Sequence, residues 1–293
     1  MPCESRAETL LAHPRFEAVI QAQARRLLDA HAAEPRLAAP FATQQRWLMG
    51  HAGLACYFRG LTGQSPDGVA YGAFLDAVQK HALASRNTAA AFFNEALKYG
   101  IVRAAAADGV AQPRVVVPAE GAVRLLMHWH LLHLSTLDAL DGNSRSQRFA
   151  AEGFAGLARM QPLVADGLLA SPAVRDPGPT YSLFTWADEG GVLMERMIVG
   201  MAGLDPVERM PTDITSVTAL ASNLALSRTH TGRKIAAAEA LGSLGWMGRR
   251  GRSPLWISLG FRREYAQAQA AKLAIVDTAF AKAGFAAASQ VFA

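Results

Sequence analysis

The spacing of apolar and polar residues predicts the same series of elements twice along the chain. In the second half it predicts a short helix capped by Thr215-Ser216 and ending near Asn223, then a helix from Ser227 to about Gly242. A strand at 255–258 and a final helix over about 262–282, with an apolar stripe at helical spacing, follow. The first half predicts matching elements, which are helices at 72–82 and 85–99, strands at 100–102 and 114–117, and a long helix at 119–140.

The two series align at a nearly constant offset. Ser85-Arg86 falls on Ser227-Arg228, and Gly100 falls on Gly242, in both cases 142 residues further along. Upstream, an apolar helix at 51–62 matches a methionine-rich helix at 192–204. The order of elements is the same in both series, although few residues are identical. We therefore expect one fold to occur twice in the chain, over about 40–142 and 180–285.

A break separates the two copies. Asp141–Ser144 stops the long helix of the first copy, a helical stretch runs from 145 to 169, and the prolines within 171–179 predict a linker. We therefore expect two domains. Residues 1–142 would hold N-terminal helices and the first copy, and residues 143–293 a connecting helix, the linker and the second copy.

Positive charge is concentrated in one short segment. The chain of 293 residues has a net charge of +5, yet residues 227–263 hold eight basic residues against the single acid Glu239, a net of +7. Such a concentration is typical of a protein that binds a polyanion, although a solvated face of a helix can also carry it.

Residues 219–242 resemble the helix-turn-helix of winged-helix bacterial regulators, and the hairpin at 249–258 resembles their wing. The likeness is greatest to the MarR type, in which long flanking helices form the dimer. It covers most of both halves at the level of fold, but only about 40 residues of the second copy are close in motif. The resemblance implies a mainly α fold with small β-hairpin wings, as two winged helix-turn-helix domains joined by long helices.

The resemblance also implies a transcriptional regulator that binds double-stranded DNA. A recognition helix in the major groove would present Ser227, Arg228, Thr229, His230, Thr231, Arg233 and Lys234, while Ile235, Ala238 and Leu241 point to the core. Arg249, Arg250 and Arg252 would lie along the DNA backbone or in the minor groove. In the first copy the matching residues are Ser85, Arg86, Asn87 and Thr88, but the apolar run Ala89–Phe93 stands where a recognition helix carries polar groups.

Several roles remain open at this point. Two units in one chain would form a monomeric pseudo-dimer, or the first copy would serve homodimerisation or ligand sensing. A winged-helix module that binds protein in place of DNA is the alternative function. By analogy with MarR-type regulators, a small aromatic effector would bind in a pocket lined by Trp47, Tyr57, Trp129, Phe184 and Trp186. A loose stripe of methionines at 194, 197, 201 and 210 fits a core or an effector pocket.

Other chemistry is sparse. We find no catalytic motif, so we expect no enzyme and no cofactor. His128, His130 and His133 lie close together, but with no Cys, Asp or Glu at ligand spacing we expect a partly buried cluster in place of a metal site. Two cysteines, no long apolar run and acidic residues near the N-terminus predict a cytoplasmic protein without a membrane span or secretory signal.

Overall fold

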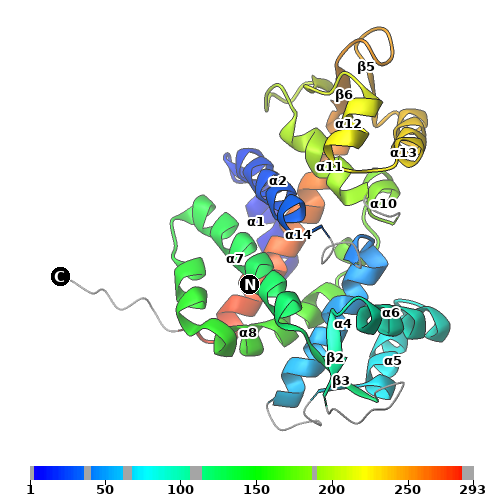
Figure 1. Cartoon of the computed structure of the whole chain (residues 1–293). Coiled ribbons are helices and arrows are strands. Elements are labelled where there is room, and N and C mark those ends of the chain that lie inside the picture. The colour runs from blue at the N-terminus through cyan, green and yellow to red at the C-terminus, as the bar shows by residue number, and fades with distance from the viewer. Residues whose placement is uncertain (1–2, 36–40, 62–67, 106–113, 187–189, 286–293) are drawn as a thin grey trace. The chain divides into compact units, whose positions relative to one another are not determined.

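The computed structural model of the chain is mainly helical and contains two small antiparallel sheets (Figure 1), as the hydrophobic pattern predicts. It describes residues 3–35, 41–61, 68–105, 114–186 and 190–285. The helices are α1 (Cys3–Leu11), α2 (Phe16–Ala33), α4 (Gln44–Arg59), α5 (Tyr71–Lys80), α6 (Arg86–Lys98), α7 (Glu120–Asp141), α8 (Arg145–Ala170), α9 (Pro172–Arg175), α10 (Pro179–Thr185), α11 (Gly190–Val199), α12 (Val217–Asn223), α13 (Arg228–Ala240) and α14 (Leu259–Lys282). The strands are β1 (Val69–Ala70), β2 (Val102–Ala104), β3 (Val115–Pro118), β4 (Arg209–Pro211), β5 (Leu244–Trp246) and β6 (Leu255–Ser258).

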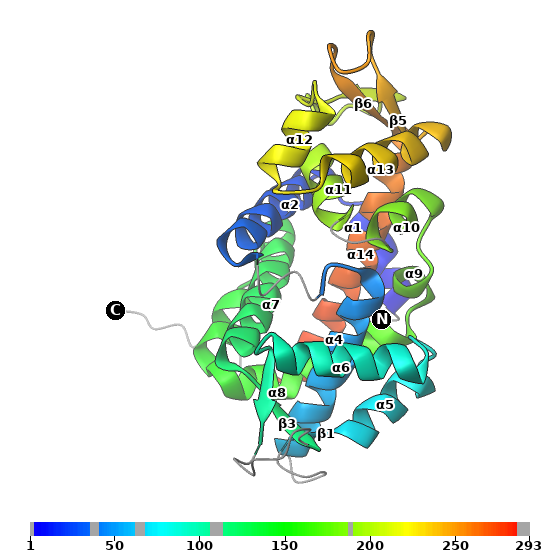
Figure 2. The ribbon, with the colours of Figure 1, turned by 45° about the vertical axis from the view of Figure 1, so that its right-hand side comes forward.

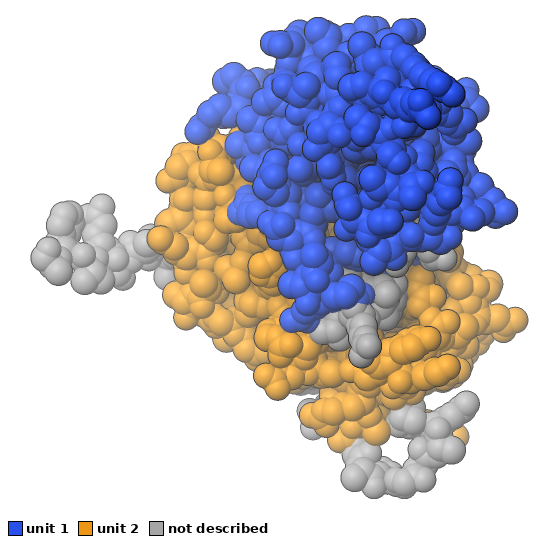
Figure 3. All heavy atoms as spheres, turned by 45° about the horizontal axis from the view of Figure 1, so that its top comes forward, with its two compact units in different colours: residues 1–44, 172–271 blue, residues 45–171, 272–293 orange. Residues whose placement is uncertain are grey.

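The chain forms two compact units, and each unit takes residues from both halves of the sequence (Figure 3). Unit 1 comprises residues 1–44 and 172–271, and unit 2 comprises residues 45–171 and 272–293. This differs from the division at residue 142 that the linear pattern predicts. The reason is long-range packing. Helix α2 belongs with the second half of the sequence, whereas α8, which was expected to belong to the second domain, and the last turns of α14 belong with the first half.

The same order of elements occurs in both halves. After α4 come β1, α5, α6, β2, β3 and α7; after α11 come β4, α12, α13, β5, β6 and α14. The strand orders β1-β3-β2 and β4-β6-β5 are also equivalent, with the last strand in the centre of each antiparallel sheet.

The helix ends and turns agree residue by residue. Ser85 Oγ accepts a hydrogen bond from the backbone N–H of Thr88, and Ser227 Oγ accepts one from that of His230. The two capped helices end before Gly100 and Gly242, whose φ angles of 67° and 69° are left-handed. The turns before the caps each place an alanine in the left-handed region, Ala82 at φ 48° and Ala225 at φ 55°. The predicted caps at Ser85 and Ser227 and the predicted glycine stop at Gly242 are therefore confirmed, whereas Gly100, expected to begin a strand, follows the end of α6 and the strand begins at Val102.

Three strands, β1, β4 and β5, were not predicted from the sequence. β1 and β4 are two and three residues long, so neither shows the alternation that identifies a strand. Each adds a third strand to its hairpin, as in the pair of Met210 with Ile257. The tip of the first hairpin, expected near Asp108-Gly109, lies outside the described residues.

In unit 1 the core lies between α2 and α11, which run side by side (Figures 1 and 2). Met194, Met197 and Met210 of the predicted methionine stripe are at most 3% exposed, so all three are buried within unit 1. Gln23 of α2 is also fully buried, and its Nε2 donates to Gln269 Oε1 of α14 at 2.9 Å. Adaptable methionine side chains thus fill the interior of unit 1.

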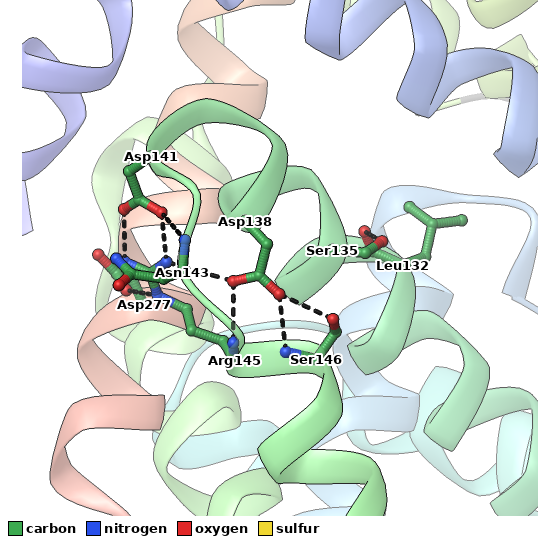
Figure 4. A network of polar contacts seen from close by, with 8 residues as sticks. All are labelled: Leu132, Ser135, Asp138, Asp141, Asn143, Arg145, Ser146 and Asp277. Atoms are coloured by element: carbon green, nitrogen blue, oxygen red, sulfur yellow. Dashed lines mark hydrogen bonds and ion pairs between the residues drawn. The ribbon is translucent and has the colours of Figure 1, made fainter. Parts of the chain in front are cut away.

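In unit 2 a buried arginine joins three segments (Figure 4). Arg145, at the start of α8, donates from Nε to Asp277 of α14 at 2.7 Å and forms two 2.8 Å hydrogen bonds with Asp141 of α7. Its Nη1 lies 3.3 Å from Asp138, whose other carboxylate oxygen accepts from Ser146. Burial by itself raises the pKa of Asp141, but hydrogen bonds from Arg145 and Asn143 outweigh it and lower the pKa to about 2.

We expect Arg145→Ala to destabilise unit 2 by about 3–5 kcal/mol, because it leaves three carboxylates without their common cation in a site where the arginine side chain is 9% exposed. The midpoint of urea unfolding at pH 7 measures this loss. Arg59→Ala is the matched control, since the ion pair of Arg59 with Asp166 is exposed at 40% and 55% and is expected to contribute less than about 1 kcal/mol. Equal losses in the two variants would contradict the role of the network.

Candidate nucleic-acid interface

Helix α13 presents a polar face to solvent. Ser227, Arg228, Thr229 and Arg233 are exposed, and His230 is half-buried. Neither Arg228 nor Arg233 forms an ion pair with any residue that the structure describes. Residues in the first turns of the helix therefore keep guanidinium and hydroxyl groups available for a partner.

Two residues predicted for this face are instead buried. Thr231 is 0% exposed and Lys234 is 5% exposed, on the same side of the helix as Ile235 and Ala238. Positions 231, 234, 235 and 238 share one helical face, so the helix cannot turn the first two outward while burying the last two. The prediction that Thr231 and Lys234 contact a groove is therefore wrong, whereas the burial of Ile235 and Ala238 is confirmed.

Lys234 has a structural role. Its ammonium donates to the carbonyl oxygens of Leu183 at 2.7 Å and Phe184 at 3.4 Å, and it lies 5.8 Å from the centroid of the Phe184 ring. These carbonyls belong to the last turn of α10, where the partial negative charge of the helix end favours a cation.

At the end of α13, Leu241 is 53% exposed, so it does not point into the core as the sequence predicted.

The hairpin of β5 and β6 carries three arginines in its loop. Arg249, Arg250 and Arg252 are all exposed, and the loop extends away from the helices of unit 1 (Figure 2). Ser253 organises the loop, since its Oγ accepts from Gly248 N at 2.9 Å and donates to Arg249 O at 3.0 Å. Arg250 also pairs with Glu239 of α13 at 2.9 Å. The loop thus holds its cations on a defined backbone.

The positive charge of residues 227–263 is only partly at the surface. Arg262 is 3% exposed and donates to the carbonyl oxygens of Asp205 and Leu204 and to the carboxylate of Glu17. Together with Lys234 it stabilises unit 1. The cations left at the surface of α13 and its hairpin are Arg228, Arg233, Arg249, Arg250 and Arg252.

Helix α6 has the same arrangement in the first half. Ser85, Arg86, Asn87 and Thr88 are exposed, as predicted. Arg86 lies 3.7 Å from Asp76 and 3.3 Å from Gln79 Oε1, in a pair that is itself exposed. Such a pair contributes little stability and is easily exchanged for another anion.

The apolar run Ala89–Phe93 faces mainly inward. Ala89, Phe92 and Phe93 are buried, at the positions that correspond to Thr231, Lys234 and Ile235. Only Ala91 of this run lies on the exposed face of α6, so most of the run does not take the place of outward polar groups, contrary to the sequence interpretation. Sequence reasoning also missed the exposed Asn94, which helical phase places on the same face as Asn87.

Two histidines of the cluster predicted in α7 are fully buried, and a third buried histidine, His51 of α4, joins them. Burial, reinforced by the charge of His130, lowers the pKa of His51 to about 3. Burial lowers the pKa of His130 to about 4, against the effect of its hydrogen bond to a backbone carbonyl. Burial and the charge of Lys272 on α14 hold the pKa of His133 well below its usual value. All three imidazoles are therefore neutral at pH 7.

The hydrogen bonds define this cluster further. Gln161 Nε2 of α8 donates to His51 Nδ1 at 3.1 Å, and His130 Nδ1 donates to the Leu126 carbonyl at 2.9 Å. His130 Nε2 and Gln161 Oε1 have no hydrogen-bond partner among the described residues. His128, in contrast, is exposed.

The aromatic residues predicted as effector walls fall in different units. Trp47 and Trp129 lie in unit 2, with ring centroids 6.1 Å apart, and both contact His51. Tyr57 also belongs to unit 2, whereas Phe184 and Trp186 belong to unit 1. There the face of the Phe184 ring contacts the ammonium of Lys234. Among the described residues, no group of three or more His, Cys, Asp or Glu side chains is placed to hold a metal ion.

No protein-family model matches the chain, and neither does any curated protein or any solved structure. Within the described part of the chain, no helix has the length and apolar character needed to cross a membrane.

Proposed function

We propose that this chain is a cytoplasmic, sequence-specific transcriptional regulator that binds double-stranded DNA and performs no catalysis. Helix α13 would enter the major groove, and the loop between β5 and β6 would follow the DNA backbone or the minor groove. The observation that carries this proposal is the exposed set Arg228, Thr229 and Arg233 on α13, next to a hairpin whose loop holds three further exposed arginines.

The order of elements supports the proposal. A strand, two helices joined by a short turn, a two-stranded hairpin and a long helix are the parts of a winged helix-turn-helix, and the likeness to MarR-type regulators belongs to the proposal as well. A helix fits the width of the major groove, and side chains from its first turns reach base edges there. Arginine suits both base edges and phosphates because its planar guanidinium donates two parallel hydrogen bonds.

The assignment of each end of the chain to the unit built mainly from the other half supports a covalent pseudo-dimer. Residues 1–44 belong to the unit built mainly from the second half, and residues 272–293 to the unit built mainly from the first. Two subunits that exchange terminal segments, joined into one chain by duplication, would show this pattern. A single chain would then supply two groove-binding helices.

The dependence of DNA affinity on salt tests the function. Purified protein is used to select bound fragments from genomic duplex DNA, and the affinity for a selected fragment is measured between 50 and 200 mM salt. With about five arginine–phosphate contacts, we expect the affinity to fall by about 100- to 1,000-fold, since each contact releases counterions.

The alternative, a winged-helix module that binds protein, predicts a different result. Such a module would select no duplex, or would bind all duplexes weakly and equally. The absence of any enriched fragment at 50 mM salt would refute the DNA-binding proposal.

A further inference from the structure

Helices α6 and α13 bury equivalent positions. The buried residues of α6 are Ala89, Phe92, Phe93 and Ala96, and those of α13 are Thr231, Lys234, Ile235 and Ala238. Each pair is 142 residues apart, as are the capping serines 85 and 227. The two helices therefore turn equivalent faces to solvent.

The exposed faces differ in chemistry. Three positions at spacing i, i+4 and i+7 are exposed in both helices; they hold Asn87, Ala91 and Asn94 in α6, and Thr229, Arg233 and Ala236 in α13. One face thus carries two carboxamides, and the other a hydroxyl and a guanidinium.

The two hairpins differ in charge. The second carries three arginines in its loop, whereas residues 104–113 of the first contain no Lys or Arg. Positive charge is nevertheless present beside α6, because Arg86, Arg103 and Arg114 are exposed. A polyanionic duplex is therefore compatible with both faces, and is held more strongly by the second.

We propose that the duplex recognised by this chain has two unlike half-sites, with α6 reading one through Asn87 and Asn94 and α13 reading the other through Arg233. This inference rests on the DNA-binding function proposed above. A carboxamide pairs with the N6 and N7 edge of adenine, and a guanidinium with the O6 and N7 edge of guanine. The α6 half-site accordingly contains an adenine at the contacted position, and the α13 half-site a guanine.

Selection from random duplexes with the full-length protein tests this inference. The wild-type protein is expected to enrich sites that contain two dissimilar conserved blocks. Asn87→Ala with Asn94→Ala is expected to relax the base preference in one block by about tenfold or more, and Arg233→Ala to relax the other by a similar factor.

Arg124→Ala is the matched control. Arg124 is exposed, as Arg233 is, but it lies on α7, outside α6, α13 and the two hairpins. Its removal is expected to leave both blocks unchanged. An inverted repeat, a site with one conserved block, or an unchanged site in the double asparagine variant would overturn the inference while leaving DNA binding established. Enrichment of no duplex by the wild-type protein would overturn both.

Discussion

Replacing Arg228 and Arg233 together by alanine is expected to weaken binding of a selected duplex by about 100-fold or more. Each bidentate contact to a base edge contributes about 1–3 kcal/mol to discrimination, and each arginine on a phosphate adds counterion release. The variant should therefore also show a shallower salt dependence, with the slope of log affinity against log salt reduced by about 1, because we expect Arg228 to contact a phosphate and Arg233 a base edge. Electrophoretic retardation across a salt series measures both effects.

The fold of this variant should be intact, because both side chains are exposed and neither forms an ion pair with a described residue. Its unfolding free energy should lie within about 0.5 kcal/mol of the wild-type value. Arg25→Ala with Arg124→Ala serves as the control, since it removes the same charge from exposed positions on α2 and α7. Wild-type affinity in the α13 variant, or an equal loss in the control, would show that α13 does not form the contact.

The second large effect is a loss of stability in mild acid. His51, His130 and His133 are buried and neutral in the folded protein, with the pKa of His51 lowered to about 3 and that of His130 to about 4. In the unfolded chain these imidazoles titrate near pH 6.5. Below that pH the unfolded state binds protons that the folded state does not, so stability falls as the pH falls from about 6.5 toward 4.

The size of the acid effect follows from the number of imidazoles. Each contributes up to about 1.4 kcal/mol per pH unit in this window, so the three together are expected to lower the free energy of unfolding by several kcal/mol between pH 7.5 and pH 5. Lys272 adds to the effect, since its positive charge opposes protonation of His133. Urea unfolding at the two pH values measures the difference.

Two variants on the same helix separate this cause from a general acid effect. His130→Leu should reduce the difference between pH 7.5 and pH 5 by about one third, whatever its stability at pH 7.5; if it does not fold, His133→Leu should give the same reduction. His128→Gln should leave the difference unchanged, because His128 is exposed. A free energy of unfolding that stays flat between pH 7.5 and pH 5 would contradict the assignment.

Local features of the site could be predicted because they depend on near neighbours. The caps at Ser85 and Ser227 join atoms three residues apart, and Gly242 ends a helix through its own backbone angles. The errors at Thr231 and Lys234 arose from judging a polar run by composition. Helical phase places both with Ile235 and Ala238, so the signal was present in the sequence.

The amino-acid sequence by itself determined the order of helices and strands, their caps and the offset that relates the two halves, because each depends on hydrogen bonds or periodicity within a few residues. Only the tertiary structure decided which cations remain at the surface and how the halves combine. Lys234 reaches carbonyls about fifty residues away, Arg145 pairs with Asp277 more than a hundred residues on, and α2 packs against α11. Such long-range contacts depend on which apolar helix and sheet faces are buried against each other, and a pattern within a few residues does not determine that.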